Sequence, residues 1–99
     1  MVALRSFSEE GPHWQEGDPV KYVYLLQSLS NSDERYVGIT SNFQNRLKQH
    51  NAGKSPHTAK HRPWQPAVVV RFEDDDRAEE FERYVKSGSG HAFARRHFW

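Results

Sequence analysis

Residues 21–51 read KYVYLLQSLSNSDERYVGITSNFQNRLKQHN, and this stretch decides the fold. Lys21–Ser28 alternates as a half-buried strand does, which predicts two opposite faces. One face holds Tyr22, Tyr24, Leu26 and Ser28, and the other holds Val23, Leu25 and Gln27. Leu29–Asp33 is rich in Ser, Asn and Asp, which favour a turn, and Arg35–Ile39 has the composition of a second strand. The stretch therefore predicts a β-hairpin.

A helix is predicted directly after the hairpin. Ser41 or Asn42 can cap its first turn by accepting a hydrogen bond from a free backbone N–H. Gly53 is suited to the position just after its C-terminus. Its apolar spacing places three side chains on one face: Phe43, Leu47 and His50. Arg46 and His50 are four residues apart and are therefore neighbours one turn apart.

The rest of the chain predicts one more strand and one more helix. Lys54–Pro66 contains three prolines and is expected to be an exposed loop, whereas the apolar run Ala67–Phe72 indicates a buried third strand. Asp74–Asp76 can cap a second helix, which the flexible run Ser87–Gly90 should end. The apolar face of this helix would hold Ala78, Phe81 and Val85. The tail is expected to form a short helix or a lid using Phe93, Phe98 and Trp99.

The order ββαβα predicts an α+β fold, with a small three-stranded antiparallel or mixed sheet flanked by helices. Ninety-nine residues fit one domain, which we place at residues 21–99 after an irregular tail at 1–20 in which Trp14 could fold back.

Cysteine is absent, which excludes disulfides, thiolate zinc sites and a cysteine nucleophile. No apolar run approaches the ~20 residues that span a bilayer, and the first twenty residues lack a signal-peptide core. We therefore expect a cytoplasmic protein.

Charge is unevenly distributed although the net charge is only +1. Acidic residues concentrate between Glu73 and Glu82, while the stretch from Arg46 to Arg62 is basic. A basic stripe indicates an anionic partner. An ordinary solvated surface explains the same charges equally well, so composition leaves both interpretations open.

Four chemically capable side chains fall within the opening stretch: Tyr24, Tyr36, Arg46 and His50. Here the sequence resembles the GIY-YIG nucleases. Val23-Tyr24 matches the first motif, Tyr36-Val37-Gly38 matches the second, and Arg46 matches the arginine of the next helix. The glutamate of a later helix is matched by Glu82. The resemblance covers roughly residues 21–99 and extends to the nuclease module of the excision-repair incision subunit.

The resemblance implies a metal-dependent endonuclease that hydrolyses phosphodiester bonds in DNA, in repair, recombination or turnover. It implies that Tyr24 is the general base with His50 assisting, and that Tyr36 binds the phosphate or the water. The two tyrosines could exchange these roles. Arg46 would stabilise the phosphate, and Glu82 would hold a single Mg²⁺, or Mn²⁺, that stabilises the leaving oxygen.

Each candidate also has an ordinary structural explanation. The tyrosines could be core-edge aromatics with satisfied hydroxyls, and His50 an exposed residue at a helix end. Glu82 could form an exposed i,i+4 pair with Lys86, and Glu79 or Glu80 would replace it if the helix register differs. Tyr22 occupies the position of the first motif's glycine. Thr40 and Ser41 stand where some relatives supply a lysine, which shifts weight to His50 for activating the tyrosine.

Basic side chains near the predicted loop are candidates for nucleic-acid binding: Lys48, Lys54, Lys60 and Arg62. Trp64 could stack on a base but is better explained as an anchor before the third strand. We expect DNA as partner, whether branched, single-stranded or damaged, and leave room for a protein partner. The alternative is a catalytically inactive module on the same fold that binds nucleic acid or docks on a partner.

Overall fold

A computed structural model describes residues 20–99, so the N-terminal tail and Trp14 lie outside the described residues. The elements follow one another as β1 (Lys21–Ser28), β2 (Arg35–Thr40), α1 (Phe43–Asn51), the 3₁₀ turn η2 (Ala59–His61), β3 (Trp64–Phe72), α2 (Asp75–Val85) and α3 (Gly88–His97). The three strands form one antiparallel sheet in the order β2-β1-β3. The predicted α+β class and the β1–β2 hairpin are confirmed.

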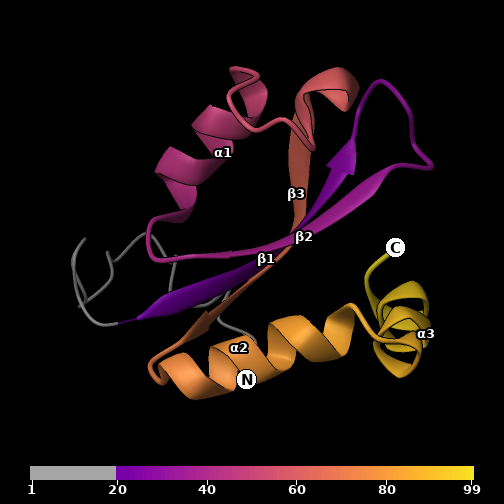
Figure 1. The fold of residues 1–99 in the computed structure, drawn as a ribbon. Helices are drawn as coiled ribbons and strands as arrows, with labels where there is room; N and C mark the ends of the chain where they lie inside the picture. Colours follow the sequence, from indigo (N-terminus) through magenta and orange to yellow (C-terminus); the bar gives the residue numbers. More distant parts are fainter. Residues whose placement is uncertain (1–19) are drawn as a thin grey trace, which may run out of the picture.

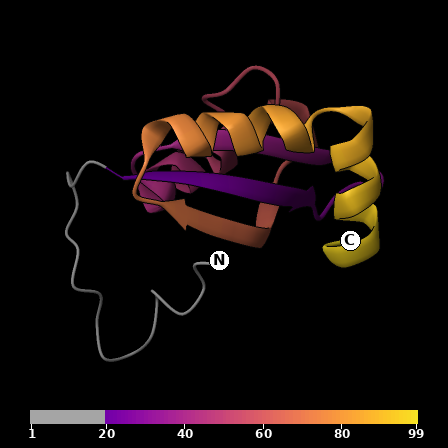
Figure 2. The same ribbon diagram turned by 90° about the horizontal axis from the view of Figure 1, so that it is seen from below.

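The helices cover both faces of the sheet, with α1 on one side and α2 and α3 on the other (Figure 1). Figure 2 shows α2 lying along the sheet and α3 turning across its end. Since β1 is the central strand, its alternating side chains supply both cores. The core beneath α1 contains Tyr22, Tyr24 and Leu26, and the opposite core contains Val23 and Leu25. The predicted two-faced pattern of β1 is therefore confirmed.

Local sequence explains where the helices begin and end. Asn42 caps α1 by accepting a hydrogen bond from the backbone N–H of Asn45. Gly53 follows the C-cap with a φ of 80°, a conformation that glycine adopts without steric cost. Asp74 caps α2 in the same way as Asn42 caps α1, and Asp75 and Asp76 place negative charge in its first turn.

The predicted start of the third strand is wrong, and its predicted burial is confirmed only in part. β3 begins at Trp64, not at Ala67, and η2 interrupts the predicted loop. Pro66 is accommodated because β3 is an edge strand and its register with β1 shifts between Leu25 and Leu26. Burial is limited to part of the strand, since Trp64, Val69 and Val70 are buried whereas Ala67 is exposed.

The glycine–serine run does not simply end α2. Its first residue, Ser87, caps α3 by accepting a hydrogen bond from the backbone N–H of Gly90. Gly90 lies so close to the preceding helix that a Cβ there would overlap the backbone of Tyr84. The tail expected as a short helix or lid is thus the helix α3. Among the described residues, none of these helices has the length and apolar character needed to cross a bilayer.

Candidate active site

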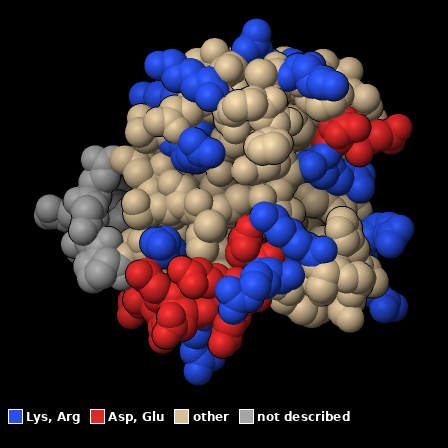
Figure 3. Space-filling view, viewed as in Figure 1, with Lys and Arg blue, Asp and Glu red and all other residues tan. Residues whose placement is uncertain are grey.

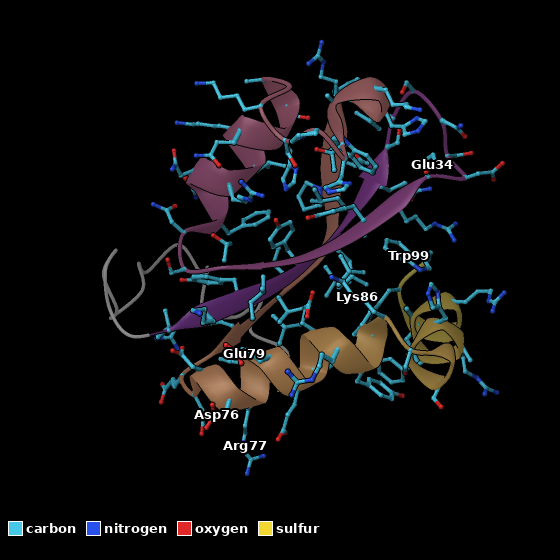
Figure 4. The ribbon with its side chains drawn as sticks, in the orientation of Figure 1. Glu34, Asp76, Arg77, Glu79, Lys86 and Trp99 are labelled. Atoms are coloured by element: carbon cyan, nitrogen blue, oxygen red, sulfur yellow. The ribbon has the colours of Figure 1, made fainter. Side chains whose placement is uncertain are left out.

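Three side chains predicted to be functional, those of Tyr24, Tyr36 and His50, meet in the core between α1 and the sheet. Figure 4 shows a layer of side chains beneath α1. The hydroxyl oxygen of Tyr24 lies 2.9 Å from Nε2 of His50. The ring of Tyr36 meets the His50 ring edge-on, with their centroids 5.0 Å apart. Tyr24 and His50 are 1% and 0% exposed, whereas Tyr36 is only partly buried. The alternative interpretation of His50 as an exposed residue at a helix end is therefore wrong.

Strand pairing explains how Tyr24 reaches this position. Tyr24 faces Gly38 across the β1–β2 pair. Because Gly38 has no side chain, the Tyr24 phenol lies over it, where a Cβ would overlap the hydroxyl. Gly38 therefore makes room for the Tyr24 ring.

The second ring nitrogen of His50 also has a partner. Its Nδ1 lies 2.7 Å from Oγ1 of Thr58, which is 1% exposed. Thr58 precedes η2 in the segment after α1, and its carbonyl accepts a hydrogen bond from the indole N–H of Trp64 at 2.9 Å. Thr58 was not predicted as a site residue, because a threonine in a polar loop gives no sign of burial. The indole of Trp64 is likewise buried, so Trp64 is an anchor and is not exposed for base stacking.

Burial dominates the acid–base properties of the pair. It raises the pKa of Tyr24 above its usual value of 10.0, and the negative charges of Tyr36 and Glu82 act in the same direction. A hydrogen bond and the positive charge from Arg46 oppose this increase. Burial, followed by the charge of Arg46, lowers the pKa of His50 below 6.5. At neutral pH the histidine is therefore neutral and the tyrosine protonated.

Arg46 lies on α1 one turn before His50 and is partly buried. Its Nη1 donates a hydrogen bond to Oε1 of Gln49 at 2.8 Å. Arginine carries five donors, so further donors are available for a ligand. Its positive charge lowers the pKa values of both Tyr24 and His50.

Glu82 lies on α2, which packs on the face of the sheet opposite to α1. Its side chain is 16% exposed and pairs with Lys86, which is 53% exposed. Figure 4 shows Lys86 between the C-terminal end of α2 and the sheet. The i,i+4 pair considered from sequence is present, but Glu82 is largely buried. Glu79 and Glu80 are exposed, so Glu82 stays the candidate glutamate.

In the described part of the chain, Glu82 has few other potential metal ligands near it. Within residues 20–99 no cluster of three or more acidic or histidine side chains could hold a metal ion. A single carboxylate fits Mg²⁺ or Mn²⁺, since Mg²⁺ is commonly bound through one or two carboxylates, waters and substrate phosphates. It does not fit a structural zinc site, which needs four protein ligands.

The four predicted nucleic-acid contacts are all exposed: Lys48, Lys54, Lys60 and Arg62. They belong to α1 and to the segment between α1 and β3. Figure 3 shows Lys and Arg gathered over the part of the molecule that contains α1, and an acidic patch over the N-terminal half of α2. The charge separation expected from sequence is thus a separation in space.

Comparison with known proteins identifies one family. The sequence profile described as the GIY-YIG catalytic domain matches residues 20–94, a range that includes every described strand and the Tyr24–His50 pair. No curated protein matches the chain.

Proposed function

The chain belongs to the GIY-YIG family, a family of endonucleases, and on this basis we propose that it is a metal-dependent endonuclease that hydrolyses phosphodiester bonds in DNA. The observation that supports this most strongly is the buried hydrogen bond between Tyr24 and His50, formed next to Tyr36. Arg46 and Glu82 both act electrostatically on the same Tyr24 hydroxyl. Tyr24, Tyr36 and His50 are in contact, Arg46 lies one turn before His50 on α1, and Glu82 comes from α2.

Proton removal from the attacking water is assigned to Tyr24 with His50. A phenol alone is a poor base because its pKa is about 10. His50 is neutral at pH 7 and its Nε2 is within hydrogen-bonding distance of the phenol, so it can take up the phenol's proton. The resulting Tyr24 oxygen then accepts the proton of the water.

Access to this oxygen is constrained. Tyr24 is 1% exposed, so the water has to approach past the partly exposed Tyr36. In this assignment the Tyr36 hydroxyl orients the water or the phosphate. If Tyr36 instead takes the proton, the two phenols exchange roles, and phenylalanine substitutions distinguish the two cases.

Arg46 and Glu82 are assigned to the phosphate. The Arg46 guanidinium stays charged at any working pH and can donate two parallel hydrogen bonds to phosphate oxygens. Glu82 would hold Mg²⁺ or Mn²⁺, and such an ion, when bound, neutralises charge on the leaving oxygen. For this the Glu82 carboxylate has to leave its pair with Lys86 at least in part.

The exposed cations on α1 and in the segment after it are proposed as contacts for the DNA backbone. They would bind phosphates without reading sequence, because phosphate contacts position a protein on DNA but do not specify bases. Because the chain belongs to the GIY-YIG family, we further propose that the enzyme acts in repair, recombination or turnover of DNA.

The experiment that tests the function uses the purified full chain and a panel of end-labelled substrates. Duplex, single-stranded and branched DNA and a matched RNA are incubated with Mg²⁺ or with EDTA. Cleavage of one or more DNA substrates with Mg²⁺ alone supports the proposal. Cleavage of RNA only would show a different substrate class. Binding without cleavage of any substrate would favour an inactive nucleic-acid-binding module on the same fold.

A further inference from the structure

Thr58 is an unusual residue for an irregular segment, because its side chain is almost completely buried and touches a residue of the site. Its Oγ1 lies 2.7 Å from Nδ1 of His50 and 3.4 Å from the carbonyl oxygen of Ser55. A hydroxyl has a single hydrogen, so it can donate to only one of these two partners at a time. Which partner receives it determines the tautomer of His50.

We propose that Thr58 is a positioning residue, which holds His50 with its proton on Nδ1 and so leaves Nε2 free to accept the proton of Tyr24. In the hydrogen bond between Thr58 Oγ1 and the Ser55 carbonyl, the hydroxyl is the donor, because a carbonyl oxygen can only accept. With its hydrogen used there, the hydroxyl oxygen can only accept from Nδ1–H. This inference rests on the proposed role of the Tyr24–His50 pair.

The other end of this chain of hydrogen bonds favours the same tautomer. Arg46 lowers the pKa of Tyr24, and because it has no acceptor atoms its guanidinium can interact favourably only with the Tyr24 oxygen. The hydrogen of Tyr24 is then free to be donated, and Nε2 of His50 lies 2.9 Å away. Nε2 can accept it only if the ring proton is on Nδ1.

Thr58 is held firmly enough for this task. The indole N–H of Trp64 donates to the Thr58 carbonyl at 2.9 Å. The backbone of Trp64 is in turn bound on both sides by the amide of Asn51, with distances of 2.6 Å from Trp64 N to Oδ1 and 3.2 Å from Nδ2 to Trp64 O. Asn51 is the next residue after His50, so Thr58 is connected to the same turn of α1 that carries the histidine.

The tautomer decides whether proton transfer is possible. With the proton on Nδ1, the O–H bond of Tyr24 can break and an N–H bond can form at Nε2, which leaves a phenolate and an imidazolium. The imidazolium keeps its Nδ1–H on Thr58. With the proton on Nε2, the ring would donate to Tyr24 and could not accept its proton. The partner of one ring nitrogen thus sets the chemistry of the other.

The first test is a two-bond ¹H–¹⁵N NMR spectrum of the uniformly ¹⁵N-labelled full chain above pH 7, with His50 assigned by its absence from a His50→Gln sample. A protonated Nδ1 and an unprotonated Nε2 in the wild-type protein support the proposal. A protonated Nε2 overturns it. This result does not depend on activity, so it stands even if no nucleic acid is cut.

The second test compares two substitutions at the same site. Thr58→Val removes the hydroxyl while keeping the branched shape, and Thr58→Ser keeps the hydroxyl. We expect Thr58→Val to lose the Nδ1–H signature and about 10- to 100-fold of the DNA cleavage rate, as is common for residues that orient a functional histidine. Thr58→Ser should restore the signature and most of the rate. A Thr58→Val protein that keeps the wild-type Nδ1–H spectrum would overturn the proposal.

Discussion

The phenol of Tyr24 lies directly over the α-carbon of Gly38, its partner across the β1–β2 pair. A Cβ on Gly38 would be 2.5 Å from Cζ of Tyr24 and 2.9 Å from Cε2 of Tyr36. Both neighbours are rigid aromatic rings within a packed cluster, so neither can move aside easily. The glycine of the second motif therefore sets the position of the tyrosine of the first.

Gly38→Ala should accordingly destabilise the protein by about 1–3 kcal/mol, as overpacking in a core does. It should also lower DNA cleavage, because Tyr24 has to move. The free energy of unfolding from urea denaturation measures the first effect. Gly88→Ala is the matched control, since a Cβ there meets nothing within 4 Å and alanine favours a helix. Equal stability of Gly38→Ala and the wild type would show that the ring is not confined as described.

Stability should depend on pH through His50. Its pKa is lowered in the folded protein by burial and by the charge of Arg46, so below pH 6.5 the unfolded chain binds more protons. The contribution of neutral His50 to the free energy of unfolding is fully present above pH 6.5. It is lost as the pH falls toward the pKa of His50 in the folded protein. We expect the free energy of unfolding to decrease over this range in the wild type, and the decrease to be smaller in His50→Gln. Parallel pH curves for the two proteins would contradict the buried, neutral state of His50.

Removing the hydroxyl group of each tyrosine in turn should distinguish the roles of the two residues in DNA cleavage. Tyr24→Phe keeps the ring over Gly38 but removes the group that bonds His50. Its cleavage rate under single-turnover conditions should fall by about 10²- to 10⁴-fold, the usual contribution of a general base. Tyr36→Phe should be less impaired, because Tyr36 is assigned to orientation. A larger decrease in Tyr36→Phe would reverse the assignment.

Lys86 should compete with metal for Glu82. Lys86→Met removes the paired cation, and because an ion pair with one exposed partner contributes about 0.2–1 kcal/mol, Mn²⁺ affinity should rise by a factor of about 1.4 to 5. Lys86→Arg, which keeps the positive charge, is the control. Electron paramagnetic resonance of free Mn²⁺ measures the affinity without DNA. Unchanged or weaker binding in Lys86→Met would indicate that Lys86 does not oppose the metal.

The basic surface should contribute by neutralising phosphates of the DNA backbone. Lys54→Ala with Lys60→Ala should weaken binding of a short DNA duplex and reduce the slope of log K against log salt by about two, because each lysine neutralises one phosphate. Arg77→Ala is the matched control, since Arg77 is an exposed cation of the acidic helix α2 (Figure 4). If Arg77→Ala changes the affinity and the salt slope as much as Lys54→Ala with Lys60→Ala does, DNA does not bind to this surface.

Much of the fold was predictable because local signals agreed with it. The alternation in β1, the cap at Asn42 and the positive φ of Gly53 all follow from residue chemistry over a few positions. The start of β3 was missed because Pro66 normally excludes a strand, and only its place at a bulge on an edge strand permits it. The glycine–serine run was interpreted as a helix end, although Ser87 caps α3.

The site was predictable only in part. Short-range spacing placed Arg46 and His50 on one helix, and the resemblance to known nucleases connected them with the tyrosines. The hydrogen bond between Thr58 and His50 was not predictable, because it depends on how Trp64 and Asn51 hold the intervening segment. The pairing of Glu82 with Lys86 was foreseen as a possibility, whereas the degree of burial of Glu82 comes only from packing.

The most direct test of the central claim is nicking of supercoiled plasmid by the wild type with Mg²⁺, by the wild type with EDTA, and by Glu82→Gln with Mg²⁺. Glutamine keeps the shape of the side chain and removes its charge, and circular dichroism verifies the fold. We predict nicking in the first reaction only. Nicking by folded Glu82→Gln at the wild-type rate, or equal nicking with and without metal, would contradict the account.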